Sequence, residues 1–293
     1  MTTPATTARD VRPERLQTAT LAHWLYGRAA GPALDDAAEA YHEASKIYPS
    51  FAARDTSGVR LLETTPQLQA SAVRAVKRHG NRPSVPLPQP DLPATTLADA
   101  ILARRSCRSF AAAPLSLAAV ATLLHSAYGV THRSRLPDGR LGQPLRAVPS
   151  GGALYPLELY LLVQRVDTLE PGLYHYDPLR HVLERLPEHA AYRPAELTAY
   201  PELLEPAGVV LLVTAMFWRT RFKYALRGYR FALLEAGHVG QNLMLAAVAL
   251  GLAAVPVGGV YDRRVEDVLG VDGVDESLVY VLSVGGDGEG EAE

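Results

Sequence analysis

Apolar residues are grouped along this chain in two kinds of run, which predict two kinds of element. Short runs at 158–163 (ELYLLV), 209–216 (VVLLVTAM) and 277–285 (SLVYVLSVG) predict strands, because their length and β-branched content suit an extended chain. The segments LYHYD and HVLERL are typical of a hairpin around Pro178.

The stretch from Arg219 to Asn242, continued to Gly251, predicts a central helix. It is too long for a buried strand, and its apolar spacing is that of a helix whose faces are nearly all covered. Polar side chains inside such a helix need partners. These side chains are Glu235, His238, Gln241 and Asn242. The last three share one face, where a buried network that satisfies loop backbone is favoured over catalysis.

Shorter helices are predicted from caps and periodicity at Leu16–Arg28, at Asp35–Lys46, in LADAILARR after Thr95 or Thr96, in LAAVATLLHSAY before Gly129, and in RRVEDVLG. Five prolines within 81–93 predict an extended linker, and residues 131–149 are typical of a mobile loop. Together the elements indicate a mixed α/β pattern. We divide the chain into an N-terminal helical extension (1–80), a proline-rich linker (81–95), a main domain (96–286) and an acidic tail (287–293).

Composition narrows the class of protein. The chain has 293 residues, 48% of them apolar, and a formal net charge of −2, so no global basic field marks a nucleic-acid binder. The apolar runs break at Gly251 and lie in mixed sequence, which favours core over membrane spans. The N-terminus lacks the charged-then-apolar order of a secretory signal, and Cys107 is the only cysteine. We therefore expect a soluble, cytoplasmic protein that binds neither nucleic acid nor membrane.

A basic cluster at one predicted helix end suits a phosphate. It contains Arg104, Arg105, Ser106 and Arg108. Guanidinium groups make bidentate, charge-assisted hydrogen bonds and stay ionised at neutral pH. A solvated basic helix end is the alternative, because positive charge there also complements the helix dipole.

Two glycine-containing turns could let backbone approach a planar ligand closely. They are Pro149–Pro156, which includes Ser150, Gly151 and Gly152, and Val257–Val260, which includes Gly258 and Gly259. Plain turns are the alternative. Neither turn has the GxGxxG order of a dinucleotide fold, and the chain has no Walker lysine motif. A mononucleotide is therefore favoured over those ligands.

In this order, RRSCRSF, PSGGALYPLELY, GLYHYDP, KYALRGYRFALLEAGHVGQN and GLAAVPVGGVYD resemble the FMN-dependent nitroreductase superfamily, most closely its SagB-type branch of azoline dehydrogenases. The resemblance covers roughly 96–285, with a weaker echo in YHEASKIYP at 41–49. It implies an α+β, nitroreductase-like fold: a central mixed or antiparallel sheet flanked by helices, here with an N-terminal helical extension.

The resemblance also implies an FMN site. Arg104, Ser106 and Arg108 would hold the phosphate and ribityl chain with Arg105 nearby, Ser150, Gly151 and Gly152 would line the isoalloxazine ring, and Gly258 and Gly259 would approach N5. Residues of both chains of a homodimer would build each site. Many relatives have a C-terminal basic residue that reaches the phosphate, whereas none follows Arg264 here. Arg140, Arg146 or Arg227 could substitute.

Lys223 and Tyr224 match the Lys-Tyr pair proposed as catalytic in azoline dehydrogenases. Aromatising a thiazoline or oxazoline removes a proton from one ring carbon and a hydride from its neighbour. The flavin takes the hydride and a base takes the proton. An adjacent ammonium lowers the pKa of a phenol, and burial lowers the pKa of a lysine, so either residue could serve as the base. A solvent-facing lysine beside a half-buried tyrosine is the alternative.

The leading hypothesis is an FMN-dependent oxidase of azolines in a ribosomal peptide or related natural-product pathway, with a peptide or small azoline substrate and a cyclodehydratase as candidate partner. The runner-up is a nitroreductase or quinone-type reductase fed by NAD(P)H, and a third is a non-catalytic flavoprotein subunit of a biosynthetic complex. No residues with metal-ligand spacing accompany His238, and we expect no metal site in this chain.

Overall fold

The computed structural model describes residues 37–47, 57–65, 68, 75–80, 82–135 and 141–288. The chain forms two compact units, residues 1–47 and 48–293. In the first unit, helix α2 (Ala37–Ala44) confirms the central part of the helix predicted at Asp35–Lys46. The helix predicted at Leu16–Arg28 lies outside the described residues. The division into extension, linker, domain and tail stays a prediction.

The second unit is built on one sheet with the strand order β1-β7-β6-β5-β8-β10-β2, and β9 also pairs with β10. All of these pairs are antiparallel. The strands are β1 (Ser84–Pro86), β2 (Phe110–Ala111), β5 (Leu157–Val163), β6 (Gly172–Asp177), β7 (Val182–Leu186), β8 (Val209–Met216), β9 (Leu252–Pro256) and β10 (Glu276–Asp287). The three strongest predicted strands and the predicted hairpin around Pro178 are thereby confirmed.

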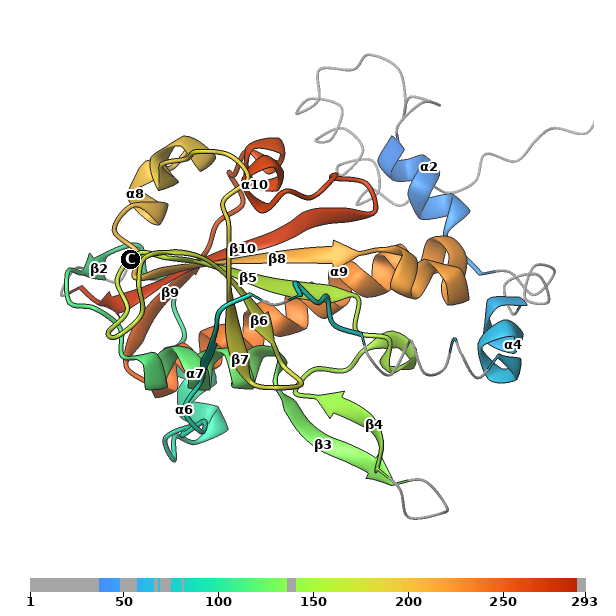
Figure 1. Ribbon diagram of the computed structural model, residues 1–293, viewed down its shortest axis with the longest axis horizontal. Helices are drawn as coiled ribbons and strands as arrows, with labels where there is room; N and C mark the ends of the chain where they lie inside the picture. Colours follow the sequence, from blue (N-terminus) through green and yellow to red (C-terminus); the bar gives the residue numbers. More distant parts are fainter. Residues whose placement is uncertain are drawn as a thin grey trace, which may run out of the picture. The chain divides into compact units, whose positions relative to one another are not determined.

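Both faces of this sheet are covered, which explains why its central strands β5 and β8 are buried along almost their whole length. On one face, Leu161 of β5 and Leu211 of β8 join a core with helices α7 (Leu117–Tyr128) and α9 (Trp218–Ala249). On the other, Leu162 and Leu212 join a second core. That second core includes residues of η2 (Pro194–Leu197), α8 (Pro201–Leu204) and α10 (Asp262–Leu269). Figure 1 shows α7 and α9 on one side of the strands and α8 and α10 on the other.

Helix α9 confirms the predicted central helix but contains a break. Ala225 has φ 47° and ψ −131°, which are not helical values, so two helical pieces meet there. A non-glycine residue with such angles is strained by about 1–3 kcal/mol and persists only where its surroundings hold it. The break lies directly after Lys223 and Tyr224.

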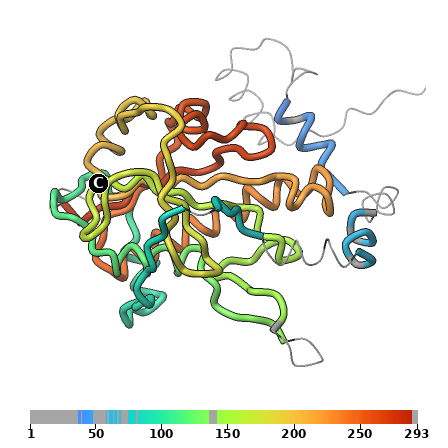
Figure 2. The backbone as a smooth tube through the Cα atoms, viewed as in Figure 1, coloured from blue at the N-terminus to red at the C-terminus, as the bar shows by residue number. Residues whose placement is uncertain are grey.

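Two segments between the predicted elements differ from expectation. Residues 131–149 were predicted as a loop, but β3 (Val130–Arg135) and β4 (Leu141–Arg146) form an antiparallel hairpin, whose arms run side by side in Figure 2. The prediction rested on several basic residues and on the sequence Pro137-Asp138-Gly139, whereas backbone pairing with two register shifts joins the two strands. Within the proline-rich segment, Ser84–Pro86 adds β1 to the sheet edge, a position that tolerates proline.

The remaining predicted helices are present as α6 (Leu97–Ala103), α7 and α10. Thr96 caps α6, since its side chain accepts a hydrogen bond from Asp99 N, and Ser116 caps α7 in the same way. Helix α4 (Ser57–Thr64) precedes the sheet. A search of the described helices finds none whose length and apolarity would let it span a bilayer.

Candidate functional site

The structure brings the Ser-Gly-Gly turn (Ser150, Gly151, Gly152) and the Lys-Tyr pair together. Gly152 has φ 65°, and a Cβ atom built on it would lie 2.6 Å from Tyr224 Oη and 3.0 Å from Lys223 Nζ. Residues about 70 positions apart in the chain therefore converge on one backbone position. A side chain at this position would be strained by the positive φ and would displace the Tyr224 and Lys223 head groups, so the position favours glycine.

Local packing explains why the Lys-Tyr pair points at this turn. Thr220 Oγ1 donates a hydrogen bond to Gly228 O (2.9 Å), and a Cβ at Gly228 would lie 2.7 Å from the Thr220 backbone, so the two pieces of α9 close tightly around the break. The Tyr224 ring packs edge-on against Phe231, with ring centroids 5.0 Å apart. Phe231 in turn lies 2.8 Å from the Cβ position of Gly151.

Glu235 is a buried carboxylic acid beside this turn. Burial raises its pKa to about 7, although the Ser150 and Tyr128 hydroxyls and the nearby Arg146 act in the opposite direction. Tyr128 Oη donates to Glu235 Oε1 (2.7 Å), whereas Oε2 is buried with no hydrogen-bond partner among the described residues. Ser150 Oγ also accepts a hydrogen bond from Tyr155 N (2.9 Å). The turn is thus fixed by polar contacts, and the predicted need of Glu235 for a partner is met on one oxygen.

The arginine segment (residues 104–108) follows α6, whose last turn is capped by Arg104. Arg105 folds back, with Nη1 donating to Leu102 O (2.8 Å) and Arg104 O (2.9 Å). Within the described part of the chain, the guanidinium groups of Arg104 and Arg108 form no ion pair. Two guanidinium groups are therefore available to an anion, and Arg105 is engaged with backbone.

Gly258 and Gly259 follow β9 and differ in their surroundings. A Cβ built at Gly258 would have no heavy atom within 4 Å, and this residue is exposed. A Cβ at Gly259 would lie 2.2 Å from the Tyr200 ring. Thr198 Oγ1 donates to Gly259 O (2.8 Å), which fixes the turn. Open space over Gly258 leaves room for a ligand to reach the backbone.

Strand register shows how far apart these groups lie in one chain. Cys107 N donates a hydrogen bond to Ala254 O on β9 (3.2 Å). Ala254 and Val209, which lies at one end of β8, both pair with Val284 of β10. Leu157, which follows the Ser-Gly-Gly turn, pairs with Ala215 near the other end of β8. The six residue steps from Val209 to Ala215 correspond to about 20 Å. One chain therefore places the arginine segment and the turn near opposite ends of the sheet.

Several polar residues have roles that differ from the expected ones. Arg146, a candidate phosphate contact, is buried with its guanidinium 4.2 Å from the Tyr128 ring centroid and 4.6 Å from that of Tyr155. It serves packing, as an amphipathic residue can. Arg227 has a buried Nε without a hydrogen-bond partner among described residues, and Arg140 lies outside them.

The predicted buried network on α9 is only partly correct. Asn242 Nδ2 donates to Ser126 O (3.1 Å) and Ala147 O (3.4 Å), so it satisfies loop backbone as expected. His238 and Gln241 are exposed, and that part of the prediction was wrong. The apolar residues around them suggested burial, but in this chain their turn of the helix faces outward.

A family comparison covers most of these residues. The model of the nitroreductase family matches residues 101–286, more than half of the chain. The chain belongs to the nitroreductase family. It is accordingly an oxidoreductase of a family that generally binds flavin, and the predicted membership is confirmed.

Curated relatives agree with this assignment. MJ1384 of Methanocaldococcus jannaschii, provisionally named a nitroreductase, is 36% identical over 181 residues, which cover 61% of this chain and 87% of that protein. The trifolitoxin-processing protein TfxB of Rhizobium leguminosarum is 35% identical over 49% of this chain and 40% of its own length. The microcin B17-processing protein McbC of Escherichia coli is 35% identical over 45% of this chain and 50% of its own length. The last two support the SagB-type branch.

Solved structures confirm the predicted α+β fold. A protein from Anabaena variabilis, provisionally assigned as a nitroreductase, superposes with a TM-score of 0.60 at 24% identity, over 84% of this chain and 45% of its own. A similar protein from Ralstonia eutropha gives 0.58 at 25% identity, over 74% of this chain and 95% of its own. The E. coli microcin synthetase McbBCD complex with truncated pro-MccB17 bound gives 0.53 at 23%, over 87% of this chain and 95% of the matched one.

Replacing Gly152 by alanine is expected to lower the free energy of unfolding of the flavin-free protein by about 1–3 kcal/mol, because a Cβ there meets Tyr224 Oη at 2.6 Å on a backbone with positive φ. Urea denaturation followed by circular dichroism measures the change. The matched control is Gly258→Ala, where a Cβ has open space, with an expected change within about 0.5 kcal/mol. Equal losses in both variants would contradict the contact.

Glu235 should make stability depend on pH. Its pKa rises from 4.5 to about 7 on folding, so the folded state holds the proton more tightly and the free energy of unfolding falls as pH rises from about 4.5 to 7. A difference of about 2.5 pH units corresponds to about 3 kcal/mol. The glutamine of the Glu235→Gln variant does not titrate. The free energy of unfolding of the variant, measured relative to that of the wild type, should therefore increase by up to about 3 kcal/mol between pH 4.5 and pH 8.

Urea denaturation at a series of pH values tests this dependence. The control variant is Glu202→Gln, which changes an exposed carboxylate and should follow the wild-type profile. Parallel profiles for the wild type and Glu235→Gln would show that Glu235 does not titrate in this window.

Proposed function

We propose that this protein is an FMN-dependent dehydrogenase that aromatises thiazolines or oxazolines to azoles in a ribosomal peptide or related natural-product pathway. The observation that carries the proposal is the convergence of Lys223, Tyr224 and Gly152. A reductase that only passes hydride through flavin needs no base for a carbon-bound proton. The resemblance to two proteins named for processing trifolitoxin and microcin B17 supports the same substrate class.

The chain's own residues fit FMN in three respects. Arg104 and Arg108 present guanidinium groups without carboxylate partners among the described residues, as a phosphate site requires. The open backbone at Gly258 can approach a planar ring closely. Ser150, Gly151 and Gly152 form a turn with small side chains beside Lys223 and Tyr224. Arg104, Ser106 and Arg108 would hold the phosphate, and the two glycine turns would line the ring.

Oxidation of the azoline removes two hydrogens from adjacent ring carbons, one as a proton and one as a hydride. Bound FMN would supply the hydride acceptor. Lys223 Nζ lies 5.2 Å from the Tyr224 ring centroid, and both head groups face Gly152. In our proposal the substrate ring sits against this turn, and one of the two head groups accepts the proton. The other holds the base in place and stabilises the charge that develops.

We infer a homodimer from two features. One chain separates the arginine segment from the Ser-Gly-Gly turn by about 20 Å along the strands, so a second chain offers the missing half of each site. Helices α6 and α9 also expose large apolar side chains, which is typical of an interface. We use the name α6–α9 apolar patch for these exposed residues of the two helices: Leu97, Ile101, Leu102, Leu233 and Leu234.

Lys223→Ala and Tyr224→Phe should retain flavin but lose azoline oxidation by about 100-fold or more, as expected when a general base is removed. The measurement is bleaching of the flavin absorbance under anaerobic conditions after mixing with a synthetic peptide that contains one thiazoline. Tyr192→Phe, a substitution of a partly buried tyrosine on the other face of the sheet, serves as the control with wild-type rates.

The same assay separates the alternatives. Wild-type rates in both Lys223→Ala and Tyr224→Phe would refute their assignment as base. A wild-type protein that NADPH bleaches while the thiazoline peptide does not would instead be a nitroreductase or quinone-type reductase. A purified protein that stays colourless when FMN is added would remove the cofactor from the proposal.

The dimer is tested by sedimentation of the flavin-loaded protein at micromolar concentration. Leu234→Glu places a charge in the α6–α9 apolar patch and should give monomers that have lost most of their FMN, because each chain would hold only half a site. Val274→Glu, at a residue 77% exposed outside the patch, should remain dimeric with FMN bound. A wild-type protein that sediments as a monomer with FMN bound would exclude the shared site.

A further inference from the structure

Three side chains that the candidate flavin site does not use converge at strands β6 and β7. His175 of β6 and Glu184 of β7 are directly paired across the two strands, and His175 Nδ1 lies 3.3 Å from Glu184 Oε2. His79 comes from the segment before β1, with its ring centroid 4.7 Å from that of His175. One ligand atom from each of the three residues lies within 4.8 Å of the others.

The His79 ring has one nitrogen that the described residues do not satisfy. Its Nε2 is buried and has no hydrogen-bond partner among the described residues. A neutral imidazole nitrogen is a metal ligand as well as a hydrogen-bonding group. Leaving it buried and unpaired costs free energy that a bound cation would recover.

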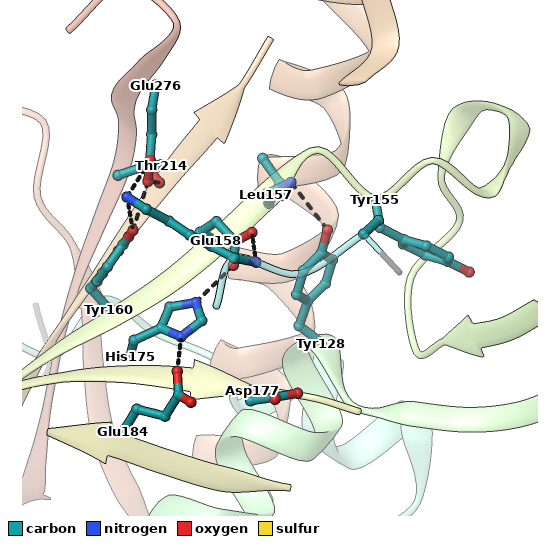
Figure 3. A network of polar contacts seen from close by, with 12 residues as sticks. Tyr128, Tyr155, Leu157, Glu158, Tyr160, His175, Asp177, Glu184, Thr214 and Glu276 are labelled. Carbon is teal, nitrogen blue, oxygen red and sulfur yellow. Dashed lines mark hydrogen bonds and ion pairs between the residues drawn. The ribbon is translucent and has the colours of Figure 1, made fainter. Parts of the chain in front are cut away.

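The surroundings of His175 have the form that metal-binding histidines adopt. Its other nitrogen, Nε2, lies 2.7 Å from Glu158 Oε2, and Glu158 Oε1 is paired with Arg219 Nη2 at 2.6 Å. A carboxylate on the second ring nitrogen fixes the tautomer that leaves Nδ1 free to ligate. Figure 3 shows His175 between the two carboxylates, with Glu158 at one nitrogen and Glu184 at the other. Arg180 pairs with Glu184 Oε1, so Oε2 is the oxygen left for a ligand.

We propose that His79, His175 and Glu184 form a zinc site, which ties the segment 75–80 to strands β6 and β7. Two ligands at about 2.0–2.1 Å from a tetrahedral zinc ion are roughly 3.3–3.4 Å apart, which matches the 3.3 Å between His175 Nδ1 and Glu184 Oε2. A shift of the partly exposed segment that carries His79 would bring its Nε2 into the third coordination position. Water fills the fourth position.

A proton is the competing occupant of the same place. Nε2 of His175 lies 2.7 Å from Glu158 Oε2 and Nδ1 lies 3.3 Å from Glu184 Oε2, so without metal a proton on each nitrogen would satisfy both carboxylates. Zinc replaces the proton on Nδ1, which is released to solvent, while the Nε2 proton stays on the imidazole ring and is donated in a hydrogen bond to Glu158.

The test uses the full chain, freed of any affinity tag, dialysed against a chelator and then titrated with zinc chloride at pH 7.5. We expect one zinc per chain by calorimetry, a rise in Tm with zinc, and a ligand-field spectrum of tetrahedral Co²⁺ when cobalt is used instead. His79→Ala and Glu184→Gln should each weaken zinc binding by more than the roughly 10–100-fold expected for the second-layer change Glu158→Gln.

His132→Ala is the matched control, because His132 is an exposed histidine on β3, outside the cluster, and its loss should leave zinc affinity unchanged. His79→Ala alters a partly exposed segment and should keep the circular dichroism spectrum of the wild type. A wild type that takes up no zinc would overturn the proposal. So would a His79→Ala protein that folds and binds zinc as tightly as the His132→Ala protein.

Discussion

Burial of both faces of the central sheet is the constraint on which the rest of the second unit depends. Leu161 and Leu211 pack against one layer of helices, while Leu162 and Leu212 pack against the other. Apolar burial of this extent drives folding and fills most of both sheet faces. The candidate flavin site instead uses the ends of strands and the turns beyond them, where the Ser-Gly-Gly turn and Gly258 are found.

The break in α9 lies directly after the Lys-Tyr pair. Lys223 and Tyr224 end the first helical piece of α9, and both of their head groups reach Gly152. The backbone strain is held by the close packing of Gly228 on Thr220. Strain held by packing is typical of functional sites.

Sequence reasoning located the strands and the central helix because each rests on a local signal: Thr96 and Ser116 caps, and apolar runs in β5, β8 and β10. It missed the β3–β4 hairpin, since strands whose residues are mostly outward-facing and polar leave no periodic pattern. The break at Ala225 was also invisible, because alanine normally favours helix and only tertiary contacts hold it at φ 47°. The proximity of Gly152 to Lys223 and Tyr224 was inferable only through the family resemblance.

The histidine and glutamate cluster was out of reach for a different reason. His79, His175 and Glu184 are brought together by strand register, and no spacing in the sequence resembles a metal motif. Sequence reasoning considered only the neighbours of His238, which is exposed. Buried ligands from separate strands become visible only once pairing is known.

One buried carboxylate connects this cluster with the candidate flavin site. Burial favours the neutral form of Glu158, but Arg219 and His175 outweigh it and hold its pKa at about 2. Its Oε1 also accepts a hydrogen bond from Lys77 N (2.7 Å), so one charged group fixes the segment before β1 and the start of α9. Removing one partner of a buried ion pair costs more free energy than the pair contributes, because the other charge is left buried and unpaired. Arg219 lies about one helical turn before Lys223, so the same ion pair joins β5 to the first piece of α9, which carries the Lys-Tyr pair.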